Sequence, residues 1–134
     1  MTGTSLHPYQ YAVLRCVPRV DREEFVNVGV IVYSQAVDVL ALAHYLDEAR
    51  LAAAFPELDL ACAAALLAHL AEVVAAVDRG EAPGGLRGRG KAFGWLSAPK
   101  STVIQPGPLH GGLAADPRAE ADALARRLVT GYPA

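Results

Sequence analysis

Residues 23–33 stand out because a valine recurs at every second position there, from 26 to 32. Valines at every second position share one face of a β-strand, since successive side chains of a strand point to opposite faces. They are Val26, Val28, Val30 and Val32. The other face carries Asn27 and Gly29, where larger apolar residues would pack better. The pattern predicts a strand with one face in the core and a polar feature on the other.

Two further strands are expected around this one. Residues 9–17 are rich in β-branched and aromatic side chains and stop at Pro18, and residues 37–43 follow a short turn at 34–36. The polar segment 18–24 joins the first strand to the second. Together they predict a three-stranded antiparallel meander.

The length of this connection suggests a register for the first hairpin. Arg15 then lies opposite Asn27, and both side chains share one face of the sheet. In the same register Val13 lies opposite Gly29. A slip of two residues would separate Arg15 from Asn27.

Three helices are predicted, each preceded by an aspartate in the N-cap position. They cover residues 47–55, 60–79 and 116–130, where 47 and 116 are the caps Asp47 and Asp116 themselves and Asp59 is the cap before residue 60. In the second helix, apolar residues recur at steps of three and four, which is typical of a buried stripe.

The segment between the last two helices predicts less regular structure. Residues 81–91 are rich in glycine and arginine and are expected to form a flexible linker. Residues 93–97 and 101–105, on either side of a turn, suggest a second hairpin, and 106–112 suggest an irregular loop.

The expected fold class is α+β, as one domain over residues 1–134 with an ordered core at 8–130. An antiparallel sheet, made of the meander and the C-terminal hairpin, would be packed on one face by the two longer helices. Arg15 and Asn27 would lie on the other face.

Composition narrows the function classes. The formal net charge is −2, with mixed signs, which argues against a general nucleic-acid binder. Charged or polar residues interrupt every apolar window of membrane-spanning length, and the first five residues do not resemble a signal peptide. We therefore expect a cytoplasmic protein without a membrane partner. Exposed sheet edges would permit a homodimer, but nothing in the chain specifies one.

Several segments resemble known functional motifs but lack a residue that the chemistry of the motif requires. Residues 94–101 imitate a phosphate-binding loop, but Pro99 replaces the second glycine and has no N–H for a phosphate. The four histidines lack ligand spacing, and Cys16 falls on a face that is expected to be buried. The sequence predicts no metal site and no cofactor.

The remaining polar set centres on Arg15, Glu24 and Asn27. Arg15 offers a rigid fork of donors for a carboxylate or phosphate, and Asn27 adds a donor and an acceptor. If the two hairpins lie side by side, more groups join this ligand site: Lys100, Ser101, Thr102, Gln105 and His110. The alternative is structural, with Arg15 paired to Glu24 and Asn27 bonded to a nearby backbone group.

Three segments carry a resemblance to a known family. They read YAVLRCVP at 11–18, EFVNVGVI at 24–31 and FGWLSAPKSTVIQP at 93–106. The chain resembles a family of short bacterial proteins known only as a domain of unknown function. The resemblance implies a partner, because family genes often lie beside a gene for a HipA-like protein kinase.

Two functional hypotheses follow. The first is a non-enzymatic binding or regulatory module that works with a HipA-like kinase. The alternative is a small enzyme acting on a phosphorylated or nucleotide substrate, with Arg15 and Lys100 holding the anion. In that enzyme Glu24 would be the general base and His110 the acid, so both must reach one cleft.

Overall fold

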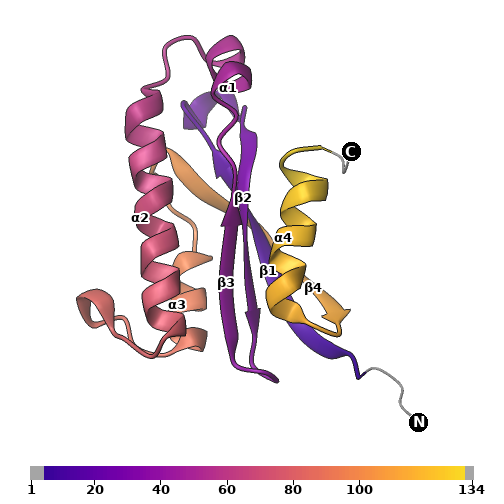
Figure 1. Cartoon of the computed structure of the whole chain (residues 1–134). Coiled ribbons are helices and arrows are strands. Elements are labelled where there is room, and N and C mark those ends of the chain that lie inside the picture. Colours follow the sequence, from indigo (N-terminus) through magenta and orange to yellow (C-terminus); the bar gives the residue numbers. More distant parts are fainter. Residues whose placement is uncertain (1–4, 132–134) are drawn as a thin grey trace.

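The computed structural model describes residues 5–131. Its centre is a four-stranded antiparallel sheet in the order β3-β2-β1-β4, which confirms the α+β class (Figure 1). The strands are β1 (His7–Cys16), β2 (Val26–Ser34), β3 (Val39–His44) and β4 (Ile104–Ala114). The helices are α1 (Glu48–Ala54), α2 (Leu60–Asp78), α3 (Arg89–Leu96) and α4 (Pro117–Leu128), with 3₁₀ turns η1 (Val20–Arg22) and η2 (Pro83–Gly85).

Helices lie on both faces of the sheet (Figure 1). On one face Leu67 of α2 and Phe93 of α3 belong to the same buried cluster as Ile31. On the other face Leu124 of α4 is buried with Val30. The two longer helices therefore do not share a face, which corrects the expected arrangement. Strand β2 is apolar on both sides, so each face needs its own cover.

A β-bulge at Val28 explains why β2 is apolar on both sides. Arg15 pairs with Asn27 as predicted, but the register then shifts and Gly29 pairs with Leu14 rather than Val13. Val28 is the extra residue, and a bulge of this kind reverses the alternation of side chains beyond it. Val26 and Val28 face α2, whereas Val30 and Val32 face α4. The four valines therefore do not share one face.

The second half of the chain differs most from expectation. Residues 93–96, predicted as the first arm of a hairpin, belong to α3, where Ala92, Phe93 and Leu96 are buried at helical spacing. Residues 106–112, predicted as a loop, lie within the eleven-residue strand β4. β4 contains Pro106 and Pro108, which an edge strand tolerates because its outer N–H groups need no partner.

The helix starts follow the predicted caps. Asp47, Asp59 and Asp116 each accept backbone N–H groups of the first turn of α1, α2 and α4. Although His69 and Glu72 interrupt its apolar residues, α2 is by length and composition alone apolar enough to cross a membrane, a test that core helices of soluble proteins also pass. One face of α2 packs against the sheet through Leu67 and Val74.

Asp78, at the end of α2, holds four elements together. Its carboxylate accepts the Leu40 N–H of β3 at 3.0 Å and Arg89 of α3 at 2.9 Å. It also pairs with Arg118 of α4 at 2.6 Å. Burial raises the pKa of the Asp78 carboxyl, but the hydrogen bonds from Arg118, Leu40 and Arg89 outweigh it and hold that pKa below its ordinary value. Asp78 thereby links helices on both faces of the sheet.

Candidate functional site

Arg15 lies near the end of β1, between Asn27 of β2 and Gln105 of β4. Its guanidinium stacks over the ring of Phe25, with Cζ 4.1 Å from the ring centroid. It also lies against Gly107, where an added Cβ would come within 2.9 Å of Cζ. Gly107 therefore makes room for the Arg15 side chain.

The hydrogen-bonding capacity of the Arg15 side chain is not fully satisfied. Within residues 5–131, the buried Nε of Arg15 has no hydrogen-bond partner. Glu24, the ion-pair partner expected under the structural alternative, bonds instead to Nε of Arg22 at 2.8 Å. An unsatisfied buried donor costs about 1–3 kcal/mol, so this placement of Arg15 carries a cost in stability.

Arg15 opens into a cavity of about 340 Å³, here called the Arg15 pocket. Besides Arg15, its lining includes Lys100 and Gln105, together with Ser97 and Pro99. Residues 106–109 of β4 complete the wall, at the point where the register with β1 shifts. None of the described residues that line this pocket is acidic. Two cations thus share a pocket without a carboxylate.

Lys100 is held in place by backbone and aromatic groups. Its Nζ donates to the Trp95 carbonyl at 2.5 Å and lies 4.4 Å from the centroid of the Trp95 ring. Burial lowers the pKa of the Lys100 amine. A partly desolvated ammonium that contacts carbonyl oxygens and an aromatic ring would gain from a nearby anion.

Other predicted ligand residues have structural hydrogen bonds. Asn27 Nδ2 donates to the Leu128 carbonyl at 3.0 Å and so ties the end of α4 to the sheet. Thr102 Oγ1 donates to the Ile104 carbonyl, and Gln105 Nε2 donates to the Thr102 carbonyl. Ser101 is exposed outside the pocket lining. Of the predicted set, the pocket brings together Arg15, Lys100 and Gln105.

The two candidate catalytic residues lie apart. His110 stacks on Tyr11 in the middle of β1, with ring centroids 5.1 Å apart, whereas Glu24 precedes β2 beside the Cys16 end of β1. Tyr11 and Cys16 are five residues apart on β1, which is roughly 16 Å of strand. Glu24 and His110 therefore do not reach a common cleft. Neither lines the Arg15 pocket.

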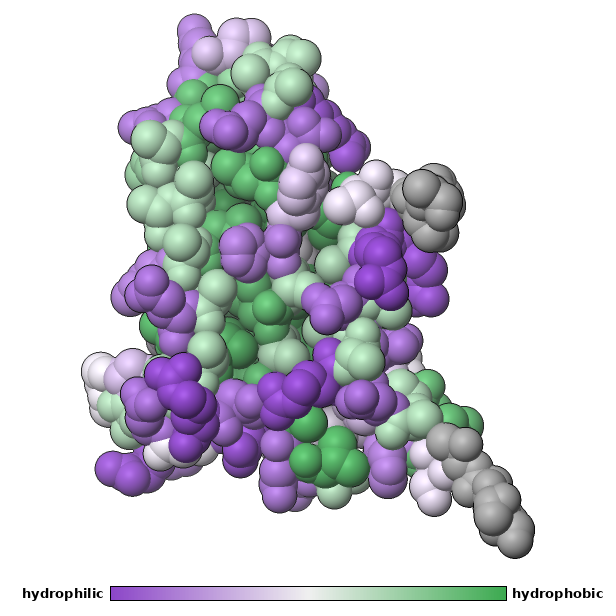
Figure 2. Space-filling view, viewed as in Figure 1, coloured by the Kyte–Doolittle hydropathy of each residue, from purple (hydrophilic) through white to green (hydrophobic). Residues whose placement is uncertain are grey.

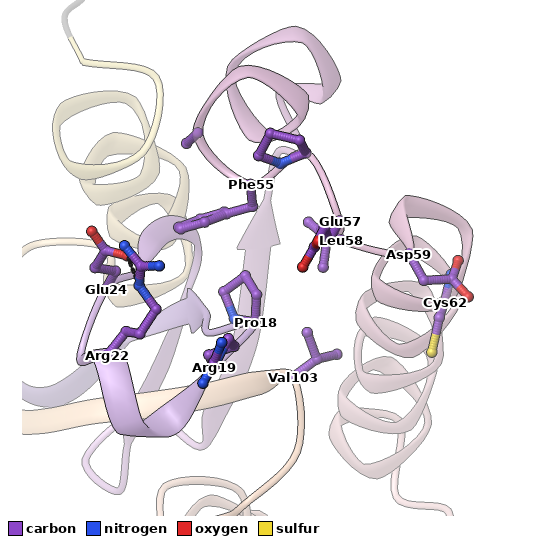
Figure 3. Close-up of a pocket in the computed structure, with 12 residues that line it drawn as sticks. Pro18, Arg19, Arg22, Glu24, Phe55, Glu57, Leu58, Asp59, Cys62 and Val103 are labelled. Carbon is purple, nitrogen blue, oxygen red and sulfur yellow. Dashed lines mark hydrogen bonds and ion pairs between the residues drawn. The ribbon is translucent and has the colours of Figure 1, made fainter.

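A larger cavity of about 680 Å³, here called the Phe55 pocket, lies between the β1–β2 and α1–α2 connections (Figure 3). Phe55, Leu58 and Val103 give it an apolar part, and charged residues of both signs, including Glu57 and Asp59, line the rest. Arg22 and Glu24 form an ion pair on its rim. Sequence reasoning missed this pocket, because its walls come from two connections whose proximity no local pattern encodes.

Both pockets lie at the same end of the sheet. Val103, which precedes β4, lines the Phe55 pocket, and Gln105 lines the Arg15 pocket. Within residues 5–131, no group of three or more His, Cys, Asp or Glu residues is placed to hold a metal ion. The chemistry available is therefore positive charge in the Arg15 pocket, and apolar side chains among charges of both signs in the Phe55 pocket.

Fold and site together define a small α+β protein with a basic pocket at one end of an antiparallel sheet. Residues 11–129 match the family described as Protein of unknown function (DUF3037), and the chain belongs to that family. This match confirms the resemblance to a family of unknown function. Comparisons with curated proteins and with solved structures found no similar protein.

Proposed function

We propose that this protein is a non-enzymatic binding or regulatory module, and that its Arg15 pocket receives an anionic group of a partner. The observation that carries the proposal is the pairing of Arg15 and Lys100 in a pocket with no acidic lining residue among those described. The planar guanidinium of Arg15, which lines the pocket, suits a carboxylate or a phosphate.

The partner we propose is a HipA-like protein kinase. The family resemblance supports this choice, since such a kinase is often encoded by the neighbouring gene. A phosphate or an acidic side chain on the kinase would supply the anion. The adjacent Phe55 pocket would accept an apolar side chain of the same partner, because both pockets open at one end of the sheet.

The pocket favours binding over catalysis. A general acid or base must lie within hydrogen-bond reach of the proton it transfers. The described lining of the Arg15 pocket contains neither a carboxylate nor an imidazole. With Glu24 and His110 far apart on the sheet, the enzyme hypothesis lacks its acid–base pair.

The test is calorimetric binding of the purified chain to a HipA-like kinase, taken from the source of this chain. Arg15→Gln and Lys100→Gln should each weaken binding about 10- to 100-fold, the loss expected for one charge-assisted hydrogen bond. Added salt should weaken wild-type binding as well. The matched control is Lys91→Gln, which changes the chain's other lysine, exposed at the start of α3.

Two results would contradict the proposal. One is the absence of measurable binding of the wild-type chain to that kinase. The other is binding that Arg15→Gln and Lys100→Gln leave at the level of the Lys91→Gln control, which would place the contact away from the Arg15 pocket.

A further inference from the structure

The outer edge of β4 is open. β4 is the last strand of the sheet, and within residues 5–131 only β1 pairs with it. The other edge strand, β3, is six residues long and lies between α2 and α4 (Figure 1). Figure 2 shows this β3 side of the molecule, where the two helices flank the sheet edge. β4 lies behind β1 in the same view and offers eleven residues.

The second half of β4 lacks the usual protection of an edge strand. Natural edges are commonly blocked by charged side chains or proline, because unpaired N–H and C=O groups recruit further strands. Residues 103–115 contain no Asp, Glu, Lys or Arg. Pro106 and Pro108 block pairing only in the first half of the strand. Residues 109–114 are left able to pair.

Two leucines on this segment are exposed although they belong to a regular strand. Leu109 is 51% exposed and Leu113 is 63% exposed. They pair with Ala12 and Pro8 of β1, and their even spacing puts them on the same face of the sheet. The face they occupy is the one covered elsewhere by α2, since Ala12 belongs to that core.

The spacing of these leucines is self-complementary. Gly111 lies midway between Leu109 and Leu113. If a two-fold axis passes through Gly111, an antiparallel β4 from a second copy places Leu109 opposite the partner's Leu113, and the reverse. A strand from a different protein would need two apolar residues at this spacing, whereas a second copy of this chain has them by symmetry.

We propose that the chain forms a homodimer through antiparallel pairing of β4 with β4 of a second copy, centred on Gly111. The pairing joins the two four-stranded sheets into one and covers both leucine pairs. Cross-strand apolar pairs and the new backbone hydrogen bonds stabilise it. The small net charge opposes it little. This inference does not depend on the proposed kinase partner.

The first test is the molecular mass in solution by sedimentation equilibrium over a concentration series. Wild type should approach twice the 14.1 kDa chain mass. Leu109→Lys/Leu113→Lys removes both apolar pairs and sets like charges opposite each other, so the dissociation constant should rise roughly 100-fold or more. Both positions are exposed, so circular dichroism should show an unchanged fold.

The second test reads the register by oxidative cross-linking. Residues directly opposite each other in an antiparallel pair are close enough for a disulfide. In a Cys62→Ser background, Gly111→Cys should yield a covalent dimer under mild oxidation. An added Cβ at Gly111 has only the Tyr9 carbonyl oxygen within 4 Å, at 3.7 Å, so the strand accommodates it. The control is Ala65→Cys, exposed on the outer face of α2.

Three outcomes would overturn the inference. If the wild-type chain is a monomer at every concentration, the proposed homodimer does not form. A dimer that Leu109→Lys/Leu113→Lys leaves intact moves the interface elsewhere. Efficient cross-linking through Ala65→Cys but not Gly111→Cys would assign the interface to α2.

Discussion

Gly29 illustrates how one residue fixes the approach of two strands. It is buried in β2, between Leu14 of β1 and His44 of β3. An added Cβ would lie 3.0 Å from the Ala43 carbonyl oxygen and 3.2 Å from Cβ of His44. The backbone of β3 is held by its pairing with β2, so moving it away from an added Cβ would cost free energy. Gly29→Ala should therefore lower the free energy of unfolding by about 1–3 kcal/mol, measured by urea denaturation.

The matched control is Gly94→Ala in α3. Gly94 is exposed, and an added Cβ there meets nothing within 4 Å. Because alanine is the better helix former, this change should raise the free energy of unfolding by about 0.5–1 kcal/mol. If both variants shift stability in the same direction, close approach of β3 is not what requires glycine at position 29.

The sequence shows that Asn27 and Gly29 are unusual in an apolar strand, and the structure shows why they are there. Both interrupt an apolar alternation, and that signal is visible without a structure. Their reasons are not, because Asn27 bonds to the Leu128 carbonyl, 101 positions away, and Gly29 is required by β3. Arg15 and Lys100 were identifiable as anion ligands by residue type, whereas their meeting with Gln105 depends on the pairing of β1 with β4.

Among helices and strands, the sequence predicted those whose formation depends on residues close together in the chain. Alternation predicted the meander, and aspartate caps predicted the starts of α1, α2 and α4. The failures were non-local. Residues 104–114 contain prolines and glycines that are typical of a loop, and these eleven residues form a strand because they pair with the edge of β1.

The docking of α4 depends on a hydrogen bond to β1. Tyr9 Oη donates to Glu120 Oε2 at 3.0 Å. Burial, followed by the hydrogen bond and charge of Glu120, raises the pKa of Tyr9 from 10.0 to about 12. Because the folded-state pKa exceeds the ordinary value, this contribution to stability is complete below pH 10 and is lost as the pH rises toward 12.

Tyr9→Phe should lower the free energy of unfolding by about 1 kcal/mol at neutral pH, since it leaves one acceptor of Glu120 without its donor. Ultraviolet titration should show a tyrosine ionising near pH 12 in wild type, and this component should vanish in Tyr9→Phe. The control is Tyr45→Phe, at an exposed position. Equal stability of the two variants at neutral pH would show that the Tyr9–Glu120 bond does not hold α4.

At the scale of the whole molecule, the sheet separates two cores that the sequence could not place. The apolar stripe on α2 predicts that this helix packs on a sheet, but it does not predict on which face, and the sequence placed α4 on the same face. The bulge at Val28 decides this, because it makes β2 apolar on both sides. Asp78 then joins the faces through Arg89 of α3 and Arg118 of α4.

Two cores on shared strands should unfold together. Leu124 of α4 is 1% exposed in the smaller core, whereas Trp95, the chain's one tryptophan, lies on α3 beside the larger core. Leu124→Ala should lower the free energy of unfolding by about 2–5 kcal/mol, the usual cost of such a cavity. Because β1 and β2 contribute to both cores, Trp95 fluorescence and circular dichroism should shift to the same lower urea midpoint. The contrary result is an unchanged urea midpoint by Trp95 fluorescence together with two separate transitions by circular dichroism. It would mean that α4 detaches by itself and that the contacts of Asp78 are too weak to couple the two cores.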